Sequence, residues 1–124
     1  MSGEITQIVN FIKSFPENYK NKVETYRHKL EKMEAKRQSV VVWGAGSKGV
    51  TFLNTFKNFE IEYVVDINPH KQGMYISGTG QKIMPPEFLK SYKPDVIIIM
   101  NPIYKKEILE LTNKLGLNTN FLYV

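Results

Sequence analysis

The sequence predicts an α/β domain with three layers and a mostly parallel sheet of about four to five strands, preceded by a long N-terminal helix or helical hairpin. Two observations predict this class. From Ser39 to the end of the chain, short apolar runs alternate with segments of helical periodicity. In addition, three glycines spaced G-x-G-x-x-G follow the first of these runs and open a helix-like pattern. Strand–helix–strand alternation implies parallel strands with right-handed crossovers.

Residues 1–37 are expected to form the helical extension. An apolar helix face is predicted by the spacing of Ile5, Ile8, Val9 and Ile12. Ser14 and Glu17 have the spacing of a capping box that would start a second helix, ending near Arg37. On this helix, steps of four and three residues join Tyr19, Val23, Tyr26, Leu30 and Met33 into an apolar seam. The seam must cover a neighbouring domain, another subunit or the chain's own sheet.

Residues 38–124 are expected to form the Rossmann-like nucleotide-binding domain. The predicted strands are 39–43, 61–65, 95–100 and 120–124, and the predicted helices are 47–57, 85–91 and 101–115. Residues 68–80 are a turn-rich loop with room for one short strand.

Composition narrows the class of protein. The 124 residues are 42% hydrophobic and 23% charged, which is typical of one globular domain. The chain has no cysteine, so disulfides, thiol catalysis and zinc–thiolate sites are excluded. No apolar run approaches the roughly 20 residues of a membrane span, and nothing resembles a signal peptide, so a cytoplasmic protein without membrane contact is expected.

The net charge of +5 does not by itself indicate nucleic-acid binding. Much of the excess lies between Lys13 and Arg37, where glutamates interrupt the basic residues as on a solvated helix face. We therefore expect no nucleic-acid partner. A small phosphorylated ligand suits the charge equally well.

The glycine loop is the strongest candidate for a ligand site. Gly44 would allow a tight turn, Gly46 would let the backbone approach a phosphate, and Gly49 would permit close helix–sheet contact. Ala45, Ser47 and Lys48 complete the loop, at a helix N-terminus that favours anions. The alternative is that the glycines serve only a strand–helix turn. The pattern of an NTPase phosphate loop is absent.

Two further polar residues fall at the ends of predicted strands. Asp66 could accept hydrogen bonds from a ribose, or it could cap the turn before Pro69. Asn101 lies where open parallel sheets bind ligands, although a helix cap is the simpler interpretation. His28 and His70 have no paired carboxylate or second ligand nearby in sequence and are interpreted as surface residues. No catalytic triad, carboxylate pair or metal-ligand cluster is legible.

Two longer stretches of the sequence resemble a known protein family. "WGAGSKGVTFLN" and "IEYVVDINPHKQGMYISGTGQKIMPPEFL" resemble the C-terminal domain of S-adenosylmethionine-dependent sugar C-methyltransferases, from about Val23 to Leu122. The joined motifs carry the resemblance: Lys48-Gly49, Thr51 and Leu53-Asn54; Val65-Asp66, Asn68-Pro69 and Lys71-Gln72-Gly73; Gly78-Thr79; Pro86-Glu87 and Leu89; Pro94-Asp95. This chain departs from the family at Val42, Gly46, Ser47 and Ser77.

The resemblance implies a binding module that is not catalytic on its own. In the family, an N-terminal module binds zinc, a middle module binds S-adenosylmethionine, and the C-terminal module helps to hold a nucleotide-linked sugar. The resemblance places the loop from Gly44 to Gly49 beside that ligand, and the same crevice would be lined by Asp66, Asn68, Lys71 and the Gly78-Thr79 turn. The zinc and methyl-donor modules are missing, so we expect no cofactor bound by this chain itself. It is either a fragment of a larger methyltransferase, with that protein's other domains as partners, or a stand-alone domain.

Two alternatives remain open. The glycine pattern with Asp66 also fits an NAD-binding domain of an oxidoreductase or sugar epimerase, although the short chain leaves little room for a catalytic region. The apolar seam also fits a structural domain that forms a homodimer through its N-terminal helix.

Overall fold

A five-stranded parallel sheet organises the protein. The computed structural model describes residues 17–124, with side chains from Lys22 onward. The strands lie in the order β3-β2-β1-β4-β5, and each neighbouring pair is parallel. Their bounds are β1 (Val40–Trp43), β2 (Tyr63–Val65), β3 (Lys82–Met84), β4 (Val96–Ile99) and β5 (Asn120–Tyr123). The predicted fold class is confirmed.

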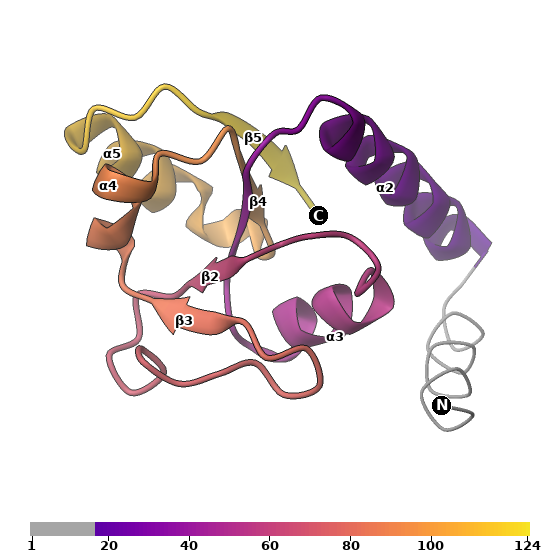
Figure 1. Ribbon diagram of the computed structural model, residues 1–124, viewed down its shortest axis with the longest axis horizontal. Coiled ribbons are helices and arrows are strands. Elements are labelled where there is room, and N and C mark those ends of the chain that lie inside the picture. Colours follow the sequence, from indigo (N-terminus) through magenta and orange to yellow (C-terminus); the bar gives the residue numbers. More distant parts are fainter. Residues whose placement is uncertain (1–16) are drawn as a thin grey trace.

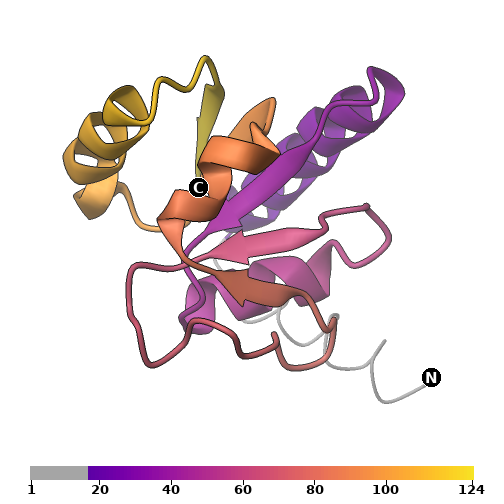
Figure 2. The same cartoon turned by 60° about the vertical axis from the view of Figure 1, so that its left-hand side comes forward.

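Helices cover both faces of this sheet. α2 (Glu17–Ala35) and α3 (Ser47–Thr55) lie on one face, and α4 (Leu89–Tyr92) and α5 (Lys105–Lys114) lie on the other (Figure 1). Figure 2 shows α4 in front of the strands and α2 and α3 behind them. Short 3₁₀ turns, η1 (Pro86–Phe88) and η2 (Pro102–Tyr104), lead into α4 and α5. The result is a three-layer sandwich.

The central strands are apolar on both sides. In β1, Val40 and Val42 belong to the core beneath α2 and α3, whereas Val41 and Trp43 belong to the core beneath α4 and α5. Successive side chains of a strand point to opposite faces, so a strand covered on both faces is a continuous apolar run. The same reason explains the apolar run of the strand predicted at 95–100, whose residues are "DVIIIM".

The apolar seam of α2 packs against the protein's own core. Val23 and Leu30 are buried in the core beneath α2 and α3, and Tyr26 and Met33 are partly buried against it. Of the three coverings that the sequence left open, the chain's own sheet is the one observed. A homodimer through this helix stays a prediction. The described seam residues that suggested it are packed against the protein's own core. The helix expected over 5–12 and the capping box that begins at Ser14 lie outside the described residues.

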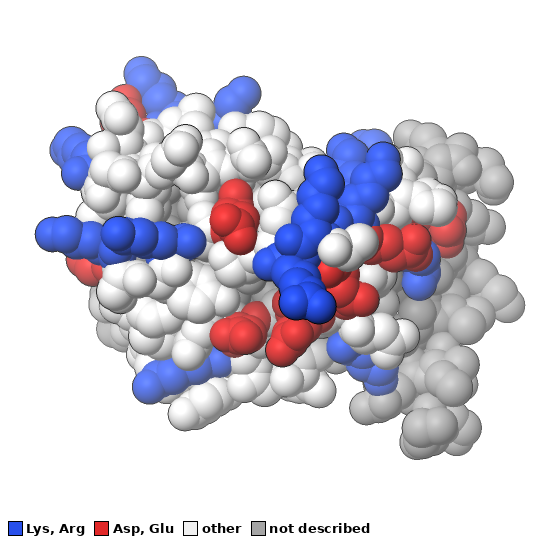
Figure 3. Space-filling view, turned by 45° about the horizontal axis from the view of Figure 1, so that its top comes forward, with Lys and Arg blue, Asp and Glu red and all other residues white. Residues whose placement is uncertain are grey.

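The surface charge is mixed. On the face shown in Figure 3, Lys and Arg side chains are interleaved with Asp and Glu. On α2, Arg27 Nε lies 3.6 Å from a Glu24 carboxylate oxygen, and His28 Nδ1 lies 3.8 Å from one of Glu31. These exposed pairs fit the solvated helix face that the sequence predicted.

Most predicted elements differ from the observed ones by a few residues at their ends, and two differ in kind. The strand β3 was not predicted at 82–84, because three residues between Gln81 and Pro85 are too short to show a period of two. The predicted helix over 85–91 is a 3₁₀ turn followed by one α-helical turn, which ends at Lys93 in the left-handed region with φ +51°.

Candidate functional site

The glycine loop connects β1 to α3, and the fold itself requires two of its three glycines. Gly44 has φ +125°, a conformation that other residues rarely adopt. A Cβ atom at Gly49 would lie 1.9 Å from the Gly44 carbonyl oxygen. Gly46 is different, because its φ is −77° and the nearest atom to a Cβ built there is Lys71 Nζ at 4.0 Å. Packing thus explains Gly44 and Gly49 but leaves the space above Gly46 open.

The N-terminus of α3 faces this open space. Gly46 is its N-cap, no side chain caps the helix, and its first turn contains no acidic residue. The free N–H groups of a helix N-terminus and its partial positive charge favour an anion. Ser47 and Lys48 lie in the same turn, and Lys48 adds a positive charge.

The loop after β2 holds the glycine loop in place through the Ala45 peptide groups. The Ala45 N–H donates to Asp66 Oδ2 over 2.8 Å, and Lys71 Nζ donates to the Ala45 carbonyl oxygen over 3.2 Å. We refer to these two hydrogen bonds as the Ala45 clasp. The other carboxylate oxygen, Asp66 Oδ1, accepts from the Asn68 N–H over 2.8 Å. Asp66 therefore caps the turn before Pro69, as one sequence interpretation held, and also fixes the loop of the neighbouring strand.

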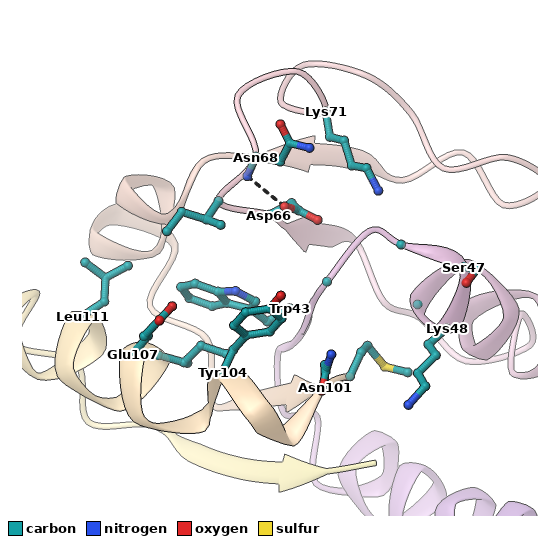
Figure 4. Close-up of a pocket in the computed structure, with 16 residues that line it drawn as sticks. Trp43, Ser47, Lys48, Asp66, Asn68, Lys71, Asn101, Tyr104, Glu107 and Leu111 are labelled. Carbon is teal, nitrogen blue, oxygen red and sulfur yellow. Dashed lines mark hydrogen bonds between the residues drawn. The ribbon is translucent and has the colours of Figure 1, made fainter.

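A cavity of about 550 Å³ opens at the carboxyl ends of β1, β2 and β4 (Figure 4). In this sheet the strand order reverses between β1 and β4, which is where open α/β sheets bind ligands. The volume is within the usual range of small-molecule sites. The predicted residues that line it are Gly44, Gly46, Ser47, Lys48, Gly49, Asp66, Asn68, Lys71 and Asn101.

Asn101 also has the structural role that the sequence favoured. Its side-chain oxygen Oδ1 accepts from the Ile103 N–H over 3.2 Å and so caps the turn η2. Asn101 therefore both lines the cavity and caps the turn η2.

The sequence did not predict the apolar half of the cavity. This half and its rim comprise Trp43, Ile67, Met100, Tyr104, Glu107, Ile108 and Leu111. The signal was present in part: Tyr104, Ile108 and Leu111 recur at i, i+4 and i+7 on one helix face. Trp43 was interpreted only as part of a buried strand, although it directly precedes the first glycine.

Three predicted site residues are placed elsewhere. Ala45 does not line the cavity, because its side chain is buried in the core while its peptide groups form the clasp. Gly78 and Thr79, which were expected in the same crevice, are also not among the residues that line this cavity. Their turn packs against α3, where Asn54 Nδ2 donates to the Ser77 carbonyl oxygen over 3.0 Å. The glycine is needed because φ is +90° and a Cβ there would lie 2.3 Å from Asn54 Oδ1.

We expect Gly78→Ala to lower the free energy of unfolding by about 2 kcal/mol, from a positive φ together with the contact to Asn54. Gly80→Ala is the matched control, because its φ is +82° but nothing lies within 4 Å of a Cβ. Urea denaturation followed by circular dichroism measures the free energy of unfolding of each variant. We expect Gly78→Ala to lose about 1 kcal/mol more than Gly80→Ala. Adding Asn54→Ala to the Gly78→Ala variant should remove this extra loss, because it removes the side chain that the new methyl group meets. Equal losses in the two glycine variants would contradict the contact.

A second cavity, of about 450 Å³, lies between the end of α2 and the starts of β1 and β2. Tyr92 and Glu62 are among its lining residues. Burial, followed by the nearby Glu62 carboxylate, raises the pKa of Tyr92. This cavity is at the amino ends of the strands, away from the glycine loop.

Within residues 22–124, whose side chains the structure describes, no three His, Cys, Asp or Glu side chains are grouped so as to hold a metal ion. The same residues include no helix with the length and hydropathy of a membrane span.

The parallel order 3-2-1-4-5, the glycine loop after β1 and a cavity at the strand ends define a Rossmann-like domain. Comparison of sequences then identifies the family: the model of the C-methyltransferase C-terminal domain matches residues 4–122. The chain belongs to this family. No curated protein sequence matches it.

One solved structure supports the fold, and two more are similar at lower TM-scores. RSP, a Rex-family repressor, superposes with a TM-score of 0.54 at 19% identity, over 82% of this chain and 60% of the repressor chain. A chorismate mutase/shikimate 5-dehydrogenase fusion protein from Clostridium acetobutylicum gives 0.45 at 22% identity, over 76% of this chain and 46% of that one. Shikimate dehydrogenase 1 from Peptoclostridium difficile gives a TM-score of 0.43 at 16% identity, over 69% of this chain and 42% of the dehydrogenase chain. Only the repressor has a TM-score above 0.5, and at 19% identity its likeness concerns the fold alone.

Proposed function

We propose that this chain is the nucleotide-sugar-binding module of a C-methyltransferase-type protein and does not transfer a methyl group by itself. The observation that carries the proposal is the cavity at the strand ends, which has a polar half with two lysines, Lys48 and Lys71, and an apolar half in one space. A nucleotide-sugar has the same division, since its diphosphate is anionic and its base is flat and largely apolar.

The polar half suits a diphosphate. Lys48 on α3 and Lys71 in the loop after β2 both line the cavity, so the two lysines come from separate elements (Figure 4). The open space above Gly46 lies at the uncapped N-terminus of α3. Backbone N–H groups, a helix N-terminus and two lysines are together a suitable set of phosphate donors.

The non-catalytic part of the proposal is based on Asp66 and Asn101, two polar side chains of the site that already have structural hydrogen bonds. Asp66 already accepts two backbone N–H groups, and Asn101 already caps a turn. These bonds position the loops around the cavity, which suits a binding site. The methyl donor would come from a methyltransferase module that acts as this domain's partner.

Calorimetric titration tests the proposal. We expect the 124-residue chain to bind at least one of TDP-, UDP- and GDP-glucose, and not NAD. Lys48→Ala and Lys71→Ala should each weaken binding about tenfold, because each removes a charge-assisted contact. Lys90→Ala, an exposed lysine on α4 outside the cavity, is the control. A folded protein that gives no heat with any nucleotide-sugar would refute the proposal, and binding of NAD alone would favour the oxidoreductase alternative.

A further inference from the structure

The two edges of the sheet differ in what lies along them. The outer edge of β3 is covered by the segment 73–76 of the same chain. There the Gly73 N–H donates to the Ile83 carbonyl oxygen over 2.7 Å, and the Ile83 N–H donates to the Met74 carbonyl oxygen over 2.8 Å. An antiparallel bridge continues this pairing. The outward backbone groups of β3 therefore have partners within the chain.

The outer edge of β5, at the other end of the sheet, is open (Figure 1). The N–H groups of Asn120 and Val124 donate to carbonyl oxygens on the β4 side, over 3.0 and 3.1 Å. Backbone groups alternate in direction along a strand, so the N–H and C=O groups of Phe121 and Tyr123 point away from β4. Among the described residues, nothing forms a hydrogen bond with these outward groups.

The strand β5 also lacks the features that keep an edge strand from pairing with another chain. Natural edges are protected by charged residues, by proline, by a bulge or by a covering segment. The residues of β5 are Asn-Phe-Leu-Tyr, without charge or proline, and their one-to-one register with β4 contains no bulge. Phe121 and Tyr123 are only partly buried against the core beneath α4 and α5. An edge of this kind is a template for another strand.

We propose that β5 pairs with β5 of a second copy of this chain, antiparallel and about a two-fold axis. The unpaired groups require an extended segment, because only a strand offers N–H and C=O groups at the matching spacing. Since the outward groups belong to residues 121 and 123, each Phe121 exchanges two hydrogen bonds with Tyr123 of the other copy. The sheets of the two copies then form one continuous sheet.

The side chains of β5 make the strand complementary to itself, which is why a second copy is the partner. Phe121 lies opposite Tyr123 of the other copy on the α5 face of the sheet, so two cross-strand aromatic pairs form. Leu122 meets its own counterpart at the two-fold axis, on the α2 face. The strand carries no charge that would repel its copy, and Lys105 Nζ lies 4.7 Å from the centroid of the Tyr123 ring, where a cation is favourable. A contact of one short strand predicts a weak dimer.

Sedimentation equilibrium of the 124-residue chain tests the pairing. We expect a monomer–dimer equilibrium of the 14.4 kDa chain with a Kd of about 100 µM. Tyr123→Pro should raise this Kd at least about tenfold, because it removes an outward N–H and leaves the hydrogen bonds to β4. Tyr123→Ala, which keeps that N–H, is the control and should raise it less. A parent chain that stays monomeric up to about 1 mM would overturn the proposal, and so would equal effects of the two variants.

Single cysteines test the register, since the chain has none of its own. Leu122→Cys would face its counterpart in a non-hydrogen-bonded pair, with Cα atoms about 4.5 Å apart, a distance that a disulfide spans. Phe121→Cys is the matched control, because residue 121 is more exposed but lies two ladder positions away from its own counterpart.

Under mild oxidation we expect a covalent dimer from Leu122→Cys and not from Phe121→Cys. Equal cross-linking of both variants would overturn this register. If the parent chain dimerises but neither cysteine cross-links, the dimer uses another surface, such as the N-terminal helix, and the proposal falls. None of these residues lines the cavity at the strand ends, so these outcomes leave the proposed function unchanged.

Discussion

Gly49→Ala is expected to destabilise the protein by about 3 kcal/mol or more, although alanine is the better helix former. The new methyl group would lie 1.9 Å from the Gly44 carbonyl oxygen and 3.0 Å from its carbonyl carbon. Both are backbone atoms of the loop that begins the site, so α3 would have to move away from β1. Urea denaturation monitored by circular dichroism measures the loss.

Gly46→Ala provides the matched control in the same loop. Its φ of −77° suits alanine, and the nearest atom to the added methyl group is the end of the flexible Lys71 side chain at 4.0 Å. We expect its free energy of unfolding to stay within about 1 kcal/mol of the parent. A Gly49→Ala variant as stable as Gly46→Ala would show that the close approach of helix and loop is not required.

This contrast separates the parts of the glycine pattern. Sequence alone could not tell whether G-x-G-x-x-G served a turn or a ligand, because both need small residues. The structure assigns Gly44 and Gly49 to the turn and the packing. Gly46 has no such structural need, so the space left by its missing side chain is the space that a ligand would occupy. We expect Gly46→Ala to weaken nucleotide-sugar binding more than it weakens the fold.

The sequence predicted the fold better than the site for physical reasons. Buried parallel strands such as 96–99 are continuous apolar runs and are visible at once, whereas β3 is only three residues long. The polar half of the site was predictable because it follows directly after strands. The apolar half depends on how α5 packs over Trp43, and no local pattern reveals which helix face borders a cavity. Gly78 was misplaced because its need for φ +90° resembles that of a ligand loop.

Asp66→Asn is expected to lower the free energy of unfolding of the ligand-free protein by about 3 kcal/mol, despite the nearly identical shape of the two side chains. The two Asp66 oxygens accept separate backbone N–H groups, from Ala45 and from Asn68, each over 2.8 Å. An amide offers one oxygen, so its NH₂ group would face one of these donors and leave it unpaired. A hydrogen bond to a charged group contributes about 1.5–3 kcal/mol, and an unpaired partly buried donor costs a similar amount.

Asn68→Asp is the reciprocal control two residues away. The Asn68 oxygen Oδ1 accepts from the His70 N–H over 3.0 Å, and an aspartate keeps that acceptor, so its stability should be close to the parent's. Thermal and urea denaturation without ligand compare the two variants. If Asp66→Asn were as stable as the parent and lost only ligand affinity, Asp66 would act through a ribose, as in a dinucleotide site. A loss of stability without ligand would instead assign Asp66 to the Ala45 clasp, which joins the glycine loop to the loop after β2.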